Sequence, residues 1–154
     1  MDKKGRYVYN WPRPMVTVDA AVFSIYGNKV RLLLVNRKDH PFKGKWALPG
    51  GFIGIDEEIE NAAARELAEE TGLTDIPLKQ MHTFGKCGRD PRGRQITVVF
   101  MGIIKGRGGK IKAGDDASQA KWFDIEKLPD SLAFDHDNVI AFGIRKLKKR
   151  KTFR

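Results

Sequence analysis

The chain has 154 residues, 41% of them hydrophobic, with a formal net charge of +10 and one cysteine. These figures exclude an intrachain disulfide, argue against intrinsic disorder and leave enough residues for one hydrophobic core. Neither an apolar run long enough to cross a membrane nor the apolar stretch of a signal peptide is present, so we expect a cytoplasmic protein with no membrane partner.

Two segments near the N-terminus predict a β-hairpin. Residues 16–26, VTVDAAVFSIY, and residues 30–37, VRLLLVNR, are strand-like, and Gly27 and Asn28 between them form a turn signal. The apolar run at 32–35 indicates that the second strand is buried on both faces.

The elements that follow predict an α/β architecture. Further strands are expected at 46–51, about 77–86, 96–104 and 120–123, with helices at 57–71 and from about 135–137 onward. Few helices connect the strands, which indicates a mixed sheet covered by helices. We find no repeat and no linker, so residues 1–154 are expected to form a single domain, with 1–14 as an N-terminal extension.

The C-terminus concentrates the positive charge. Residues 145–154, RKLKKRKTFR, hold seven basic groups and no acidic group, which leaves +3 of the total +10 for the rest of the chain. A basic tail can contact nucleic acid or an anionic membrane, but cations also complement the C-terminal end of a helix. Because no nucleic-acid motif accompanies the tail, we favour a solvated helix end and keep a nucleic-acid contact as the alternative.

The predicted helix at 57–71 carries acidic residues on the face where apolar residues are expected. Asp56 suits the N-cap position, and Gly72 suits the left-handed position after the last turn. At about 100° per residue, Glu66 and Glu70 fall about 20° either side of the apolar Ile59, in the middle of the inward face. Like charges one turn apart are destabilising, so the cluster requires a positive partner.

Two partners can neutralise these carboxylates. Arg65 projects away from Glu66 and Glu70 on the helical wheel and suits Glu69 better. A divalent cation fits more closely, since carboxylate oxygens are the ligands that Mg²⁺ and Mn²⁺ prefer, and Mg²⁺ commonly adds substrate phosphates. A solvated acidic face is the alternative, but the inward position argues against it.

The same stretch resembles the signature of the Nudix hydrolases, G-x5-E-x7-R-E-U-x-E-E-x-G-U, where U is a bulky aliphatic residue. Every fixed position from Gly51 to Leu73 matches. The resemblance implies an α/β/α sandwich around a mixed sheet, and hydrolysis of a nucleoside diphosphate linked to another group. It implies metal binding by three carboxylates and one backbone carbonyl, those of Glu66, Glu69, Glu70 and Gly50. It also implies that Arg65 orients the carboxylates and that Glu57 supports them.

Softer motifs resemble the ADP-ribose pyrophosphatase-type subgroup. They include VTVDAAVF, LLLVNRKDHPFKGKWALPGGF, GRDPRG, AGDDASQAKWF and FDH. This resemblance implies ADP-ribose as the substrate, with AMP and ribose 5-phosphate as the products. The general base is either a carboxylate of the signature or one on the later loop, where Asp115 and Asp116 are candidates; a turn stabilised by these side chains is the alternative.

Three loop residues and one tryptophan are candidates for substrate binding. Arg89 and Arg92 of GRDPRG can grip phosphate, since arginine binds phosphate with two donors, and Asp90 lies between them; a turn with solvated charges is the alternative. Trp46 can stack on adenine or belong to the core. His136 and Cys87 are assigned no chemistry.

Two rival functions remain open. The first is a Nudix hydrolase for another nucleotide, such as NADH, a dinucleoside polyphosphate, an oxidised nucleoside triphosphate or an RNA 5′ end. The second is a non-catalytic ADP-ribose sensor, which we disfavour because all the carboxylates of the signature are present and the sequence ends one short helix after the predicted sandwich. Many relatives form homodimers, which makes a homodimer a further expectation.

Overall fold

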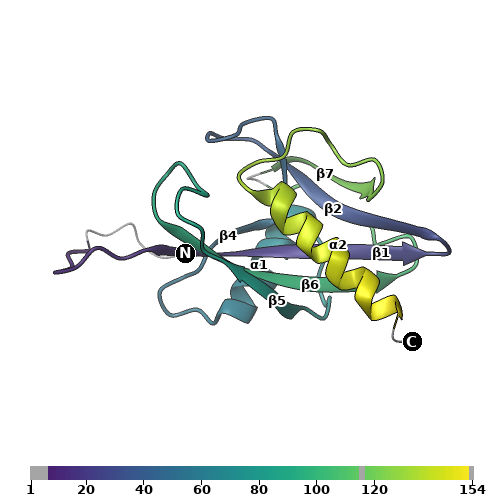
Figure 1. Cartoon of the computed structure of the whole chain (residues 1–154), viewed down its shortest axis with the longest axis horizontal. Coiled ribbons are helices and arrows are strands. Elements are labelled where there is room, and N and C mark those ends of the chain that lie inside the picture. Colours follow the sequence, from purple (N-terminus) through teal and green to yellow (C-terminus); the bar gives the residue numbers. More distant parts are fainter. Residues whose placement is uncertain (1–6, 115–116, 153–154) are drawn as a thin grey trace.

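The computed structural model describes residues 7–114 and 117–152, which form seven strands and two helices (Figure 1). In chain order these are β1 (Met15–Tyr26), β2 (Lys29–Arg37), β3 (Trp46–Ala47), β4 (Gly50–Phe52), α1 (Ile59–Thr71), β5 (Lys79–Phe84), β6 (Gln95–Lys105), β7 (Ala117–Asp124) and α2 (His136–Thr152). None of the described helices is both long and apolar enough to cross a membrane.

The strands form one mixed sheet with the order β3-β2-β1-β6-β5, to which β4 and β7 add by pairing with β1 and β2. The pair β1–β6 is parallel, and the other pairs are antiparallel. The hairpin turn at Gly27 has a φ of 58°, the left-handed conformation that glycine adopts at little cost, so the predicted turn is confirmed.

The two helices cover opposite faces of the sheet, as the alternation along β1 shows. Val18 packs with Ala62 and Ala63 of α1, whereas Ala21 and Phe23 pack on the other face against α2. Figure 1 shows α2 crossing in front of the sheet while α1 lies behind it. The predicted α/β/α sandwich is therefore confirmed, as is burial of β2 on both faces, where Leu32, Leu33 and Leu34 are all 0% exposed.

On one side, strand β1 pairs with β4 in its first half and with β2 in its second half. Thr17–Asp19 pair with β4, whereas Phe23–Tyr26 pair with β2. Between them, Ala20 N–H donates to the Pro49 carbonyl at 2.8 Å. Residues of β2 and of β4 line a polar pocket at this point of the sheet.

Two predictions about local structure were wrong. The segment at 46–51 forms two short strands, because β3 pairs with β2 while β4 pairs with β1. Helix α1 begins at Ile59, with Glu58 as an N-cap that makes no side-chain capping bond, so neither the start at 57 nor an Asp56 cap is correct. The carboxylate of Glu57 instead accepts the Gly54 N–H at 2.9 Å, which folds the preceding loop as a turn.

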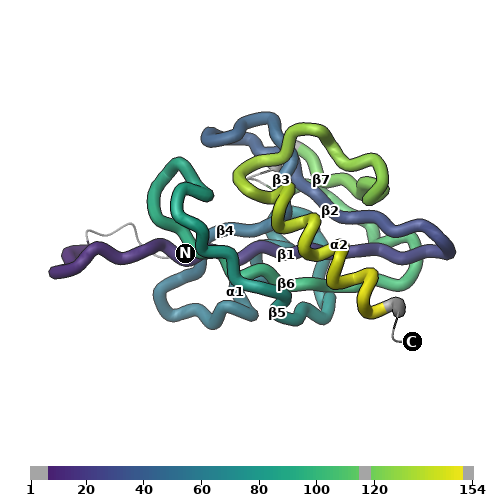
Figure 2. The backbone as a smooth tube through the Cα atoms, in the orientation of Figure 1, coloured from purple at the N-terminus to yellow at the C-terminus, as the bar shows by residue number. Residues whose placement is uncertain are grey.

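The helix ends match the sequence prediction more closely. Gly72 has a φ of 75° and its N–H donates to the Ala68 carbonyl, as expected for a left-handed C-terminal cap. Helix α2 begins at His136, within the predicted range, and its Ile140 and Leu147 are buried in the core. The tube in Figure 2 shows that the described N-terminal segment projects beyond the sheet at one end of the long axis, while α2 runs toward the other.

Candidate active site

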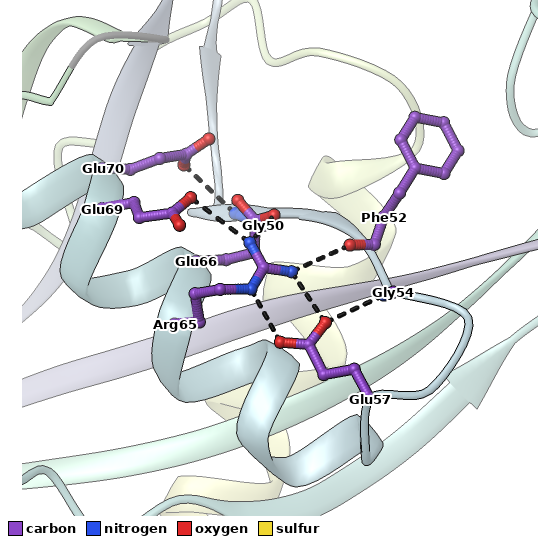
Figure 3. A network of polar contacts seen from close by, with 8 residues as sticks. All are labelled: Gly50, Phe52, Gly54, Glu57, Arg65, Glu66, Glu69 and Glu70. Carbon is purple, nitrogen blue, oxygen red and sulfur yellow. Dashed lines mark hydrogen bonds and ion pairs between the residues drawn. The ribbon is translucent and has the colours of Figure 1, made fainter. Parts of the chain in front are cut away.

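A guanidinium at the centre of α1 binds three of the four glutamates of the signature (Figure 3). Arg65 Nε lies 2.7 Å from Glu57 Oε1, and its Nη1 lies 2.8 Å from Glu66 Oε1 and 3.3 Å from Glu69 Oε2. The prediction that Arg65 points away from Glu66 was wrong, because a helical wheel fixes the direction of Cβ and the long arginine side chain bends past its neighbour.

These ion pairs connect the helix to the loop that precedes it. Arg65 Nη2 donates to the Phe52 carbonyl at 3.1 Å, and hydrogen bonds from Arg65 and then from Gly54 N–H lower the pKa of Glu57 to about 2. The bonds with Glu57, more than those with Glu66, raise the pKa of Arg65 above its already high value, so the network stays charged at neutral pH.

Two glycines of β4 let the carboxylates approach the backbone. Gly50 N–H donates to Glu70 Oε2 at 3.2 Å, and a Cβ added at Gly51 would collide with the Glu66 carboxylate. Glu66 is thereby held with a side chain only 12% exposed, whereas Glu69 is 56% exposed at the rim. Glycine is therefore needed at Gly51, where a Cβ would displace the Glu66 carboxylate, and at Gly50, where a Cβ would collide with the Val18 carbonyl and Asp19.

Glu66 and Glu70 line a pocket of about 370 Å³ whose other walls come from distant parts of the chain. These include Asp19 of β1, Arg37 of β2, Gln95 of β6 and His136 of α2. A neighbouring hollow shares Glu66 and adds Glu57, Arg65 and Glu69. Glu66 therefore stands on the ridge between the two hollows.

The acidic side chains at the pocket can hold a divalent cation only together with water or substrate oxygens. Within 7–114 and 117–152, no three acidic, histidine or cysteine side chains converge into a complete protein cage. Mg²⁺ commonly needs only one or two carboxylates and completes its coordination with water and phosphate oxygens. Glu66 and Glu70, which line one pocket and are one helical turn apart, meet that smaller requirement.

The loop before β6 is held by two internal ion pairs. Arg89 Nη2 lies 2.6 Å from Asp135 Oδ1, and Arg92 Nη2 lies 2.8 Å from Asp90 Oδ2. Burial raises the pKa of Asp90, but hydrogen bonds from the Arg92 side chain and backbone outweigh it and leave the pKa below its usual value. The alternative of a turn with solvated charges is therefore wrong for Arg89, which is 4% exposed, and stays open for Arg92, which is 36% exposed. Arg89, Asp90 and Arg92 all line the pocket.

Trp46 lies away from this group. Its indole packs edge-on against Phe123, with ring centroids 4.8 Å apart, and it belongs to the core. It is absent from the described lining of the pocket, so its packing agrees with the core interpretation and not with stacking on adenine.

The candidate bases Asp115 and Asp116 lie outside the described residues. The residue before them is anchored to the signature helix, since Gly114 N–H donates to the Glu70 carbonyl at 3.2 Å. This bond brings the described end of that loop to the C-terminal turn of α1, beside the carboxylates that line the pocket.

A buried polar wall of the pocket, formed by Asp19, Gln95 and His136, was not predicted from the sequence. Asp19 Oδ2 accepts a 2.5 Å hydrogen bond from Thr97, and His136 Nε2 lies 3.8 Å from Asp19 Oδ1. His136 Nδ1 accepts the Leu48 N–H, and burial lowers the pKa of its imidazole despite the opposing effects of Asp19 and Asp135. The available signal was an aspartate in the middle of an apolar strand.

Comparisons with known proteins bear on this geometry. A family model described as NUDIX domain matches residues 15–142. An ADP-ribose pyrophosphatase from Methanocaldococcus jannaschii is 46% identical over 86% of this chain and 74% of its own length. The ADPR responsive transcriptional repressor NtrR from Acinetobacter baylyi is 32% identical over 94% of this chain, which spans 58% of the repressor.

Two solved structures are similar throughout the sandwich. The NUDIX domain of Shewanella oneidensis NrtR, complexed with ADP ribose, has a TM-score of 0.80 at 34% identity, covering 89% of this chain and 90% of that domain. A bifunctional NMN adenylyltransferase/ADP ribose pyrophosphatase from Francisella tularensis, complexed with AMP and a manganese ion, has a TM-score of 0.75 at 34% identity, covering 90% of this chain and 43% of that protein.

Proposed function

This chain belongs to the Nudix family, and from that premise we propose that it hydrolyses ADP-ribose to AMP and ribose 5-phosphate. The observation that carries the proposal is that Glu66 and Glu70 of the signature helix line the polar pocket. The 46% identity to an ADP-ribose pyrophosphatase supports this substrate over other nucleotides.

We propose that Glu66 and Glu70 hold a divalent cation, with Glu69 and the Gly50 carbonyl as further ligands, and that Mg²⁺ is the physiological ion. A bound cation would neutralise charge on the diphosphate and lower the pKa of a coordinated water. The Francisella tularensis relative is complexed with a manganese ion, which supports a divalent metal as the cofactor. Arg65 and Glu57 orient the carboxylates through the ion pairs at 2.7–3.3 Å described above.

The cationic side of the pocket is suited to the phosphates of the substrate. The guanidinium of Arg92 is 36% exposed beside the pocket, so it can reach a ligand while its pairing with Asp90 fixes its position. Arg89 is 4% exposed and bonded twice to Asp135, which favours a positioning role for this residue. We therefore propose Arg92 as the phosphate contact, supported by Arg89 and Asp90.

A carboxylate of this chain takes the proton as water attacks phosphorus. Glu69 at the exposed rim and Asp116 on the loop after Gly114 are the two candidates. Comparing the kcat of Glu69→Gln and Asp116→Asn separates them, since replacing the base should cause the larger loss. Equal, small losses in both variants would remove both candidates.

A regulatory protein that binds ADP-ribose is the second candidate function. It is supported by the repressor relative, of which this chain spans 58%. The experiment that separates the two functions is turnover of ADP-ribose, NADH and 5′-triphosphate RNA at equal concentrations with Mg²⁺ or Mn²⁺, with product identification. We expect AMP and ribose 5-phosphate from ADP-ribose and loss of activity with a chelator. Tight binding of ADP-ribose without any turnover would favour the regulator.

The organisation of the chain is also a proposal. We propose one Nudix domain over residues 1–154, in which 1–14 are an extension and 145–154 a basic tail. The family match at 15–142 supports these limits.

A cytoplasmic location agrees with an exposed, unpaired Cys87, and cell fractionation would test it. Analytical ultracentrifugation would test the expected homodimer.

A further inference from the structure

A buried carboxamide borders the pocket without a protein partner. Gln95, the first residue of β6, is 1% exposed, and neither its Oε1 nor its Nε2 has a hydrogen-bond partner in the part of the chain that the structure describes. Burying an unbonded amide destabilises a folded protein, so such groups are uncommon away from functional sites. The position of Gln95 in the pocket lining makes a ligand the natural partner.

The surrounding sheet shows that an apolar residue would be expected at this position. Gln95 lies on the face of β6 that also carries Thr97, and farther along that face Val99 and Met101 form the core under α2. Where the face reaches the pocket it becomes polar, with Thr17 of β1 paired to Thr97. Polar residues at the pocket end of a strand face that is apolar elsewhere indicate that this end of β6 contacts a ligand.

The neighbouring polar groups are already engaged with one another. Thr97 donates to Asp19 at 2.5 Å, and the imidazole of His136 accepts the Leu48 N–H at 3.1 Å. Gln95 takes part in neither contact. One pocket contains Gln95 together with Glu66 and Glu70, so a single substrate can contact the amide and the carboxylate site.

We propose that Gln95 is a specificity-determining residue that hydrogen-bonds the vicinal hydroxyl pair of a ribose in the substrate, an inference that rests on the proposed ADP-ribose hydrolysis. A carboxamide offers an acceptor and two donors, and adjacent sugar hydroxyls can complement both. The polar setting beside Thr17 and Asp19 suits a sugar.

The rim of the pocket argues against an adenine base in the same place. An amide can also bond the edge of adenine, but a base needs an aromatic face on which to stack. The phenyl rings in the pocket lining are those of Phe52 and Phe134, and the guanidinium of Arg92 lies 5.3 Å and 5.2 Å from their centroids. Arg92 therefore already covers part of both rings.

The test compares wild type with Gln95→Leu on three substrates: ADP-ribose and its analogues lacking the 2-hydroxyl of either the adenosine ribose or the terminal ribose. We expect kcat/KM for ADP-ribose to fall about 10- to 100-fold in the variant, while one of the deoxy analogues is turned over at the same slow rate by both proteins. The Tm should stay constant or rise, because leucine removes an unbonded buried amide.

Gln80→Leu, at an exposed position on β5, is the matched control and should leave all rates unchanged. If leucine prevents folding, Gln95→Met replaces it as the closer match in shape. Equal losses on all three substrates together with a lower Tm would make Gln95 structural and overturn the inference. A fourth substrate, the hypoxanthine analogue of ADP-ribose, tests the base. If Gln95→Leu removed the preference for adenine over hypoxanthine and left the effect of the hydroxyls unchanged, the amide would bond the base, and the inference would be overturned.

Failure of the proposed function gives a different result. A wild-type protein that does not hydrolyse ADP-ribose removes the enzyme and the ribose assignment together. A wild-type protein that hydrolyses ADP-ribose but discriminates against the deoxy analogues just as strongly after Gln95→Leu removes the ribose assignment alone.

Discussion

Two polar regions line the pocket, and they are built in different ways. The signature segment contributes a charged network from residues 57–70, and its central Arg65 is 36% exposed. The buried polar wall consists of Asp19, Gln95 and His136 from three distant segments, each of them at most 8% exposed. The residues of the first region are close together in the sequence, and several are exposed to solvent. The residues of the second region come together only in the folded chain and are almost completely buried.

The difference decides what each region can do. Charges near water keep their ionised state at low cost and can exchange partners, which suits carboxylates that must accept a cation. Buried groups lose hydration, so they must be bonded within the protein or meet a ligand. The signature segment is therefore suited to reaction chemistry and the buried polar wall to recognition.

The largest effect is expected when a carboxylate of the helix is replaced, because the helix is assigned the reaction chemistry and the buried polar wall the recognition of the substrate. We expect Glu70→Gln to lower kcat for ADP-ribose by about 10²- to 10⁴-fold, because a neutral amide is a much weaker ligand for a cation or proton. Glu60→Gln, exposed in the first turn of the same helix, is the control and should keep wild-type activity. Steady-state kinetics with Mg²⁺ check the result, and a fully active Glu70→Gln protein would contradict the division.

The next largest effect compares a buried ion pair with an exposed one. Arg89→Met removes a 4% exposed guanidinium from Asp135 and should lower the free energy of unfolding by about 3–5 kcal/mol. Arg65→Met, at a 36% exposed site, should lower it by about 1 kcal/mol or less.

Urea denaturation measures both changes. Adding Asp135→Leu to Arg89→Met should restore much of the stability, because the stranded carboxylate is removed. Similar losses from Arg65→Met and Arg89→Met would mean that burial does not distinguish the two regions.

A smaller, pH-dependent effect is expected from the buried wall. Because burial lowers the pKa of His136 below its ordinary 6.5, the unfolded chain takes up a proton that the folded chain resists. The stability from neutral His136 is complete above that pH and falls as the pH decreases, by up to about 1.4 kcal/mol per pH unit.

His136→Asn provides the comparison, since its side-chain carbonyl can accept the Leu48 N–H without titrating. The difference in unfolding free energy between wild type and this variant should shrink as the pH is lowered from 7 toward 5. A constant difference over that range would show that His136 carries no burial penalty for its charged form.

The smallest effect belongs to the exposed network. With hydrogen bonds from Arg65 lowering the pKa of Glu57 from 4.5 to about 2, the stability that Glu57 adds is complete above 4.5 and lost as the pH falls toward 2. Glu57→Gln should therefore differ from wild type most above pH 5 and least near pH 2. Chemical denaturation at a series of pH values checks this, with Glu58→Gln, which is exposed, as the control. A difference that grows on acidification would contradict it.

The sequence was informative where the deciding interactions are close along the chain. The turn at Gly27, the cap at Gly72 and the inward position of Glu66 and Glu70 all follow from short-range geometry. The start of α1 was less accurate, since Glu57 is drawn to Arg65 and Gly54 and does not continue the helix. The direction of the Arg65 side chain was also predicted wrongly. A helical wheel gives only the direction of Cβ, whereas the long side chain is positioned by its ion pairs with Glu57 and Glu66.

By itself, the sequence determined the α/β class, the acidic face of the helix and the family of the chain, because a helical repeat and a signature are encoded within a few turns. Only the tertiary structure decided that Asp19, Gln95 and His136 line one pocket, that Trp46 packs in the core, and that Arg89 is paired with Asp135. Those contacts join residues up to more than a hundred positions apart, and their geometry exists only once β1 and β6 are paired and α2 lies across them.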